Sequence, residues 1–89
     1  MRIKVRAIGA LRSAFGTGSL DVDAPDGSDL ASLIRIISEG RSELVENLSD
    51  VLHLSLILVN GVEVGNLNGL KTVLIDDSEV IFVPVTHGG

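Results

Sequence analysis

The chain contains one clear helical pattern, Asp29-Leu30-Ala31-Ser32-Leu33-Ile34-Arg35-Ile36-Ile37-Ser38-Glu39. The apolar residues Leu30, Leu33, Ile34 and Ile37 recur at i, i+3, i+4 and i+7, which places them on one stripe of a helix. An apolar stripe is stable only when another layer of structure covers it. The sequence therefore predicts a helix over about 29–39 that packs on a second layer.

Two strand patterns precede this helix. Apolar and charged residues alternate over 2–8 and again over 20–24, and Ile8 falls on the same face as the basic residues of the first pattern. The segment 9–18 between them predicts a longer turn, so the two strands should pair as an antiparallel hairpin. In that hairpin the aspartates of the second strand would face the basic residues of the first.

The residues after the helix predict a second hairpin. Gly40 is suited to end the helix, and residues 41–50 have the spacing of a shorter second helix. A nearly continuous apolar strand follows at 54–59, and Asn60-Gly61 suits the two positive-φ positions of a type I′ turn. The chain then returns as a short strand over 62–64.

A last strand pattern over 79–85 follows the acidic turn at 76–78. Because Pro84 has no N–H to donate, this strand should leave the sheet near that residue. Strands on both sides of one main helix favour an α+β fold, a mixed four- to five-stranded sheet with the helix across one face. We expect residues 1–85 to form this domain and residues 86–89 to form a flexible tail.

Composition excludes several classes of function. The chain has 89 residues, no cysteine and a net charge of −5, and Phe15 and Phe82 are its only aromatic residues. A nucleic-acid binder needs a basic surface with stacking aromatics, so direct nucleic-acid binding is disfavoured. The longest apolar stretch, 54–59, is too short to span a membrane, and the N-terminus lacks the apolar block of a signal peptide. These features favour a cytoplasmic protein without disulfides or a thiolate metal site.

The sequence ends in His87-Gly88-Gly89, a poor way to end a strand for stability because glycine loses the most backbone freedom on folding. Two residues without Cβ atoms can, however, thread a narrow channel and present the carboxylate of Gly89 to another enzyme. Together with Val59-Asn60-Gly61 and the closing strand Glu79-Val80-Ile81-Phe82-Val83-Pro84-Val85, this ending resembles the ubiquitin-like β-grasp sulfur carriers. That family includes the MoaD and ThiS proteins, the ubiquitin-related modifier and the archaeal small modifier proteins.

The resemblance implies a carrier and not an enzyme, with no catalytic residue and no permanently bound cofactor. A ubiquitin-activating-type adenylyltransferase would use ATP to adenylate the Gly89 carboxylate, which would then become a thiocarboxylate. Its sulfur would serve molybdopterin synthesis, thiamine synthesis or tRNA thiolation, so the implied partners include the molybdopterin synthase large subunit, a thiamine synthesis enzyme or a tRNA thiolase. Two alternatives stay open: Gly89 is joined to lysines of target proteins, or the tail is inert and the domain only binds proteins.

Strand parity indicates where a partner would dock. If the side chains of Val80 and Phe82 point beneath the helix, those of Ile81 and Val83 point to the opposite sheet face, the one that bears Ile8. An exposed apolar patch beside the tail is a candidate docking site, and the resemblance implies the same positions. The predicted docking residues are Ile8, Ile81, Val83 and Val85. The neighbouring tail residues are His87 and Gly88.

Other motifs carry weaker signals. Gly16-Thr17-Gly18 resembles a fragment of a phosphate-binding loop, but neither a following helix nor a lysine stands where a P-loop needs it, so we expect a turn. His53 has no second histidine or cysteine at metal-ligand spacing, and we expect no metal site. The acidic residues at 76, 77 and 79 are expected to serve as turn and solubilising residues.

Overall fold

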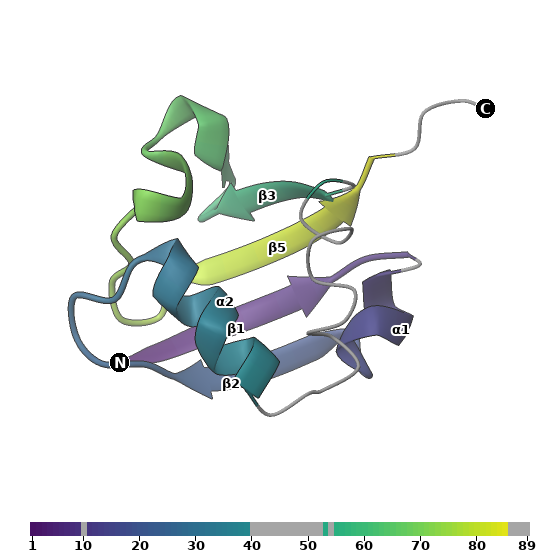
Figure 1. Cartoon of the computed structure of the whole chain (residues 1–89), viewed down its shortest axis with the longest axis horizontal. Coiled ribbons are helices and arrows are strands. Elements are labelled where there is room, and N and C mark those ends of the chain that lie inside the picture. The colour runs from purple at the N-terminus through teal and green to yellow at the C-terminus, as the bar shows by residue number, and fades with distance from the viewer. Residues whose placement is uncertain (10, 40–52, 54, 86–89) are drawn as a thin grey trace.

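The computed structural model describes residues 1–9, 11–39, 53 and 55–85. Within these residues the chain forms one mixed sheet of five strands in the order β2-β1-β5-β3-β4, with helix α2 across one face (Figure 1). The strands are β1 (Arg2–Ala7), β2 (Ser19–Asp23), β3 (Ser55–Val59), β4 (Val62–Glu63) and β5 (Glu79–Pro84). The helices are α1 (Leu11–Phe15) and α2 (Leu30–Glu39), and the 3₁₀ turns are η1 (Val64–Asn66) and η2 (Gly69–Lys71). The predicted α+β fold class is confirmed.

The first hairpin has the predicted antiparallel register. Lys4 lies opposite Asp21, and Arg2 lies opposite Asp23, whose Oδ1 is 3.9 Å from the Arg2 Nε atom. The aspartates therefore face the basic residues of β1, as the alternating pattern predicts. Both side chains of the Arg2–Asp23 pair are mostly exposed, so this pair adds little stability.

The prediction of a longer turn over 9–18 is wrong in part, because this segment contains the short helix α1. Leu11 and Phe15 are both buried, and their i, i+4 spacing puts them on one face of that helix. The Phe15 ring lies 5.0 Å from the Phe82 ring between centroids, at an interplanar angle of 48°. Two apolar residues are too few for a sequence pattern to predict a helix. Burial against the core supplies the stabilisation that propensity lacks.

Helix α2 buries the predicted stripe, since Leu30, Leu33, Ile34 and Ile37 are each no more than 6% exposed. The helix begins where a cap is available, because the Asp29 carboxylate accepts a hydrogen bond of 2.9 Å from the backbone N–H of Ser32. The predicted stop at Gly40 and the predicted second helix over 41–50 lie outside the described residues.

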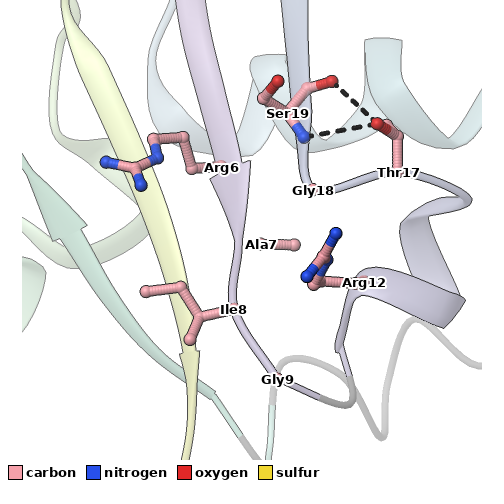
Figure 2. A pocket seen from close by; sticks show the side chains of 8 residues that line it. All are labelled: Arg6, Ala7, Ile8, Gly9, Arg12, Thr17, Gly18 and Ser19. Atoms are coloured by element: carbon pink, nitrogen blue, oxygen red, sulfur yellow. Dashed lines mark hydrogen bonds between the residues drawn. The ribbon is translucent and has the colours of Figure 1, made fainter.

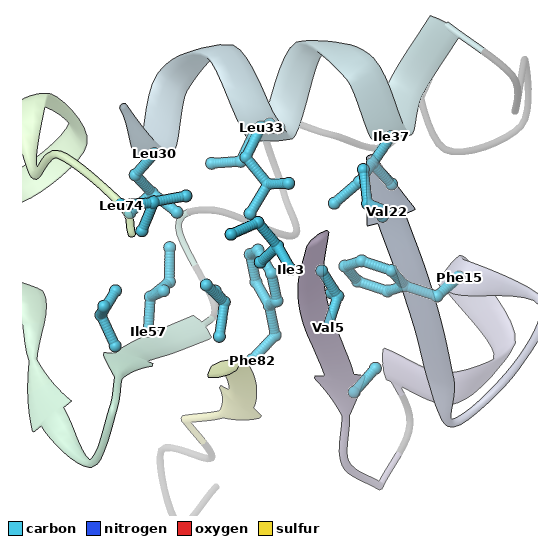
Figure 3. Close-up of a cluster of buried hydrophobic side chains, with 14 of the residues drawn as sticks. Ile3, Val5, Phe15, Val22, Leu30, Leu33, Ile37, Ile57, Leu74 and Phe82 are labelled. Atoms are coloured by element: carbon cyan, nitrogen blue, oxygen red, sulfur yellow. The ribbon is translucent and has the colours of Figure 1, made fainter. Parts of the chain in front are cut away.

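The core lies between α2 and the sheet, with Phe82 at its centre (Figure 3). Every strand except the two-residue β4 contributes side chains that are buried there. The buried core residues from β1 and β2 are Ile3, Val5, Ala7 and Val22, and those from β3 and β5 are Ile57, Val59, Val80 and Phe82. Leu74, from the segment between η2 and β5, joins the same cluster. This single cluster holds the helix and the sheet together.

The turn between β3 and β4 has the predicted conformation, with φ of 50° at Asn60 and 84° at Gly61. The Asn60 side chain also reaches β5, because its Oδ1 accepts a hydrogen bond of 2.9 Å from the backbone N–H of Glu79. The backbone N–H of Asn60 donates to the Glu79 carbonyl at 2.8 Å. The predicted strand over 62–64 is one residue shorter, since Val64 begins the 3₁₀ turn η1.

Strand β5 occupies the middle of the sheet. It runs parallel to β1, with Val5 opposite Val80, and antiparallel to β3, with Val59 opposite the same Val80. The strand ends at Pro84, the position where the missing N–H predicts that the chain leaves the ladder. Beyond the strand, the half-exposed Val85 is the last residue that the structure describes.

We expect Asn60→Ala to lower the free energy of unfolding by about 2 kcal/mol, because alanine is strained at positive φ and cannot accept from Glu79. Asn60→Gly removes only the side-chain hydrogen bond and should cost about half as much, about 1 kcal/mol. Urea unfolding of both variants measures the two contributions. Equal loss in both variants would contradict the assigned backbone contribution.

The pKa of Asp29 is lowered, first by the hydrogen bond from the Ser32 backbone N–H and then by the Ser32 hydroxyl. A carboxyl group with a lowered pKa stabilises the fold above its ordinary value of 3.8 and loses that contribution as the pH falls through the folded value. Asp29→Asn keeps an N-cap oxygen but does not titrate. Between pH values above and below 3.8, denaturant unfolding should therefore show the wild type losing more stability than this variant. Parallel losses would contradict the assignment.

Candidate functional site

Strand β5 divides its side chains between the two faces of the sheet. Val80 and Phe82 are 0% and 1% exposed in the core, whereas Ile81 and Val83 are half-buried on the face away from α2. This is the parity that the sequence predicts, because successive side chains of a strand point to opposite faces. The outer side chains therefore belong to the same strand that fixes the core.

Ile8 joins these residues because β1 runs parallel to β5. The backbone N–H of Ile8 donates to the Phe82 carbonyl at 3.1 Å, which continues the ladder one residue beyond the end of β1. The Ile8 side chain is 42% exposed and points toward β5 in Figure 2. Ile8 therefore lies on the same face as Ile81 and Val83, at the end of β5 from which the tail departs.

Two leucines on β3 extend this apolar surface. Leu58 lies opposite Ile81 and Leu56 lies opposite Val83, so their side chains share the outer face of the sheet. Leu56 is 37% exposed and Leu58 is half-buried. We call the resulting surface the outer-face patch, and it consists of Ile8, Leu56, Leu58, Ile81, Val83 and, just beyond the strand end, Val85.

Leu56 and Leu58 are not recognisable as outward-facing residues from the sequence. The strand over 54–59 is apolar at nearly every position, so alternation does not show which residues face the core. Only the antiparallel register between β3 and β5 assigns them to the outer face. Once the pairing of β3 with β5 is known, the alternation of β5 identifies which residues of β3 face outward.

Charged side chains border the outer-face patch. Arg6 lies opposite Ile81 in the ladder between β1 and β5, and its Nη1 atom is 3.8 Å from the Glu79 Oε2 atom. Both side chains are about half exposed, at 54% and 40%, so solvent screens this pair. An apolar centre with a polar border is the usual composition of a surface that binds another protein.

The predicted tail residues His87, Gly88 and Gly89 lie outside the described residues, so the division into a domain over 1–85 and a flexible tail over 86–89 stays a prediction. The structure places the end of β5 beside the outer-face patch, with Val85 38% exposed. Any chain that continues from Val85 therefore starts at the border of this patch.

The remaining sequence motifs occupy turns. Gly16 has φ of 77°, and the Thr17 Oγ1 atom contacts the Ser19 carbonyl at 3.2 Å and the Ser19 N–H at 3.4 Å. The segment leads into β2, as the turn prediction requires. The acidic turn at 76–78 is also structural, because the Asp76 Oδ1 atom accepts from the Arg2 N–H at 2.8 Å.

The described residues hold no group of three or more His, Cys, Asp or Glu side chains that could bind a metal ion. His53 is exposed. No helix in the described part of the chain is long and apolar enough to span a membrane.

Comparison with solved structures gives close matches in fold. Urm1 from Trypanosoma brucei has 27% sequence identity and a TM-score of 0.75, covering 99% of this chain and 95% of its own. Small archaeal modifier protein 1 from Methanosarcina acetivorans has 25% identity and a TM-score of 0.79, covering 99% and 96%. The complex of subunits 1 and 2 of molybdopterin-converting factor from Helicobacter pylori matches at 24% identity and a TM-score of 0.66, over all of both chains. Protein-family models and curated protein sequences give no match.

These likenesses and the described architecture define a ubiquitin-like β-grasp protein. The chain resembles the ubiquitin-like sulfur carriers and modifiers, because its fold is similar to that of Urm1, small archaeal modifier protein 1 and the putative molybdopterin converting factor subunit 1 from Pyrococcus furiosus. The resemblance predicted from the closing strand and the Gly-Gly ending is confirmed at this level.

Proposed function

We propose that the chain is a sulfur carrier whose reactive group is the carboxylate of Gly89. The observation that carries the proposal is the position of β5, which is fixed in the core by Val80 and Phe82 and ends beside the exposed outer-face patch. A rigid domain can dock on another enzyme through that patch while the following residues extend into its active site. Catalytic groups then belong to the partner, and this chain supplies the substrate carboxylate.

The first step is activation of the carboxylate, because oxide is not a workable leaving group. A carboxylate oxygen of Gly89 attacks the α-phosphorus of ATP in the activating enzyme, the bond between the α-phosphorus and the bridging oxygen breaks, and pyrophosphate leaves. The product is an acyl-adenylate with AMP as its leaving group. Cationic groups of the activating enzyme would stabilise the phosphate charge that develops.

The second step replaces AMP with sulfur. Hydrosulfide attacks the carbonyl carbon, AMP departs with the bonding electron pair, and a C-terminal thiocarboxylate remains. If the donor is a persulfide, the first product is an acyl disulfide, and a thiol must reduce its S–S bond to release the thiocarboxylate. This chain has no cysteine, so both the sulfur and the reducing thiol would come from partners.

A second function shares the first step. If a lysine ε-amine attacks the activated carbonyl instead of sulfur, an isopeptide bond joins Gly89 to a target protein. The names of the relatives support keeping this alternative, since one of them is a small archaeal modifier protein. Both functions require the same tail and the same activating enzyme.

The proposed partners are a ubiquitin-activating-type adenylyltransferase and one sulfur-accepting enzyme. The complex of subunits 1 and 2 of molybdopterin-converting factor supports a stable partner for a protein of this fold. The candidate acceptors are a molybdopterin synthase large subunit, a thiamine synthesis enzyme and a tRNA thiolase, with target-protein lysines in the second function.

Mass spectrometry of the native protein separates these functions. Exchange of one carboxylate oxygen for sulfur increases the mass by about 16 Da, whereas conjugation attaches the whole chain to a lysine of another protein. Thiocarboxylate without conjugates supports the sulfur carrier, and conjugates support the modifier. Finding neither in cells that contain the activating enzyme would refute both.

We expect deletion of Gly89 to abolish ATP–pyrophosphate exchange by the cognate activating enzyme, because the carboxylate withdraws by about 3.5 Å. Gly88→Ala should also reduce exchange, since a Cβ narrows the fit of the tail in a channel. The described fold ends with β5, so the free energy of unfolding should change by less than about 1 kcal/mol. Full exchange by the truncated chain would favour the alternative in which the tail is inert and the domain only binds proteins.

Charged substitutions in the outer-face patch should weaken binding of the activating enzyme. Ile81→Glu and Val83→Glu each place a carboxylate where an apolar contact would form, and we expect at least a tenfold loss of affinity, equivalent to about 1.4 kcal/mol. Ile75→Glu is the control, because Ile75 is 67% exposed and lies outside the patch. Isothermal titration with the activating enzyme measures all three, and normal binding by the patch variants would contradict this docking surface.

A further inference from the structure

A second surface feature lies where β1 and β2 diverge, at the end of their hairpin next to α1. The last paired residues are Arg6 and Ser19, and the Ala7 N–H donates to the Gly18 carbonyl at 3.0 Å before the two segments separate. The hollow between them has a volume of about 510 Å³ and opens beside Ile8 (Figure 2). Two arginines and no acidic residue line it, although the whole chain carries a net charge of −5.

Arg12 is the central cation of this hollow. Its side chain extends from α1 to lie over the backbone of Gly18, and a Cβ built on Gly18 would be only 3.1 Å from the Arg12 Nε atom. A residue with a Cβ at 18 would therefore require the Arg12 side chain to shift by a few tenths of an ångström. Among the described residues, the Arg12 side chain has neither an ion pair nor a hydrogen bond, so its five N–H donors are available to an acceptor.

Arg6 also lines the hollow, and its guanidinium is turned over β5 (Figure 2). Its one ion pair within the described part of the chain is the long contact with Glu79 at 3.8 Å, and both groups are largely solvated. Such a pair contributes little, so Arg6 can turn to another anion at small cost. The hydroxyl of Ser19 lies on the same face, because Ser19 is the cross-strand neighbour of Arg6.

We propose that this hollow binds the phosphate group of a small molecule, with Arg12 as the primary contact and Arg6 and Ser19 as secondary contacts. Thr17 and Gly18 line one wall, but the cations come from β1 and α1 and not from the lysine and helix of a P-loop. The planar guanidinium fork of Arg12 matches two phosphate oxygens.

A phosphate fits this donor set better than a carboxylate. One arginine satisfies both oxygens of a carboxylate, whereas a phosphate presents additional oxygens to Arg6 and to the hydroxyl of Ser19. The volume of the hollow also lies within the range of small-molecule pockets, about 300–1,000 Å³. Room remains for the group that carries the phosphate.

The hollow is coupled to the strand that leads to the tail. A Cβ on Gly9 would lie 3.3 Å from the Pro84 Cγ atom, and the Ile8 N–H donates to the Phe82 carbonyl, so one wall of the hollow packs directly on the end of β5. A phosphate bound there would be held beside the start of the tail. The binding does not depend on activation of Gly89, so it can be tested on the protein alone.

Titration of the ¹⁵N-labelled full chain with inorganic phosphate, at constant ionic strength adjusted with chloride, tests the proposal. We expect saturable shifts of the backbone amides of residues 6–9, 12 and 17–19. Arg12→Gln should weaken binding by at least about tenfold, while the matched control Arg35→Gln, on α2, should bind like the wild type. Non-saturable shifts, or equal affinity in Arg12→Gln, would overturn the proposal.

Gly18→Ala provides a variant that keeps every charge. Gly18 does not have positive φ, so alanine is allowed there, but its Cβ would require the Arg12 side chain to shift from its present position over residue 18. We expect weaker phosphate binding with an unchanged melting temperature. Wild-type affinity in this variant would contradict the assigned position of Arg12.

Parallel titrations identify the source of the phosphate. Equal affinity for inorganic phosphate and AMP would show that the phosphate group alone is recognised, and a preference for AMP of about tenfold or more would indicate a nucleotide ligand. Acetate serves as the carboxylate probe, and binding of acetate as tight as that of phosphate would overturn the assignment to phosphate.

Discussion

The insertion of β5 between β1 and β3 is the constraint on which the rest of the structure depends. Each hairpin alone leaves an unpaired edge, and β5 pairs with both of them, parallel to β1 and antiparallel to β3. Val80 and Phe82 complete the core at this position, where they are almost fully buried. A slip of one residue in β5 would move both side chains out of the core, so the register is strongly specified.

The same register decides what the opposite face presents. Because Val80 and Phe82 must point toward α2, Ile81 and Val83 must point away from it, and the antiparallel neighbour adds Leu56 and Leu58. Core residues and residues of the proposed docking surface therefore alternate along one strand. This arrangement suits a carrier, since the docking surface and the start of the tail are held rigidly by the centre of the core.

The parts of the fold that were predicted from sequence depend on local patterns. The α2 stripe repeats over two turns, and Asn60-Gly61 has a specific backbone requirement that few other residue pairs meet as well. Helix α1 was not predicted because it is only five residues long, and its buried pair Leu11 and Phe15 gives no repeating pattern. The hollow at the end of the first hairpin was also not predicted, since Arg6, Arg12 and Gly18 line the same hollow only after β1 and β2 have paired.

The helix, the two hairpins and the alternation of the last strand can be predicted from the sequence, because each depends on residues close together in the chain. The strand order, the addition of Leu56 and Leu58 to the patch and the position of Arg12 over Gly18 follow from the folded sheet alone. These features join residues that are distant in sequence or that have no periodic pattern. The free energy that fixes them comes from burial and strand pairing across the whole sheet, which no local segment encodes.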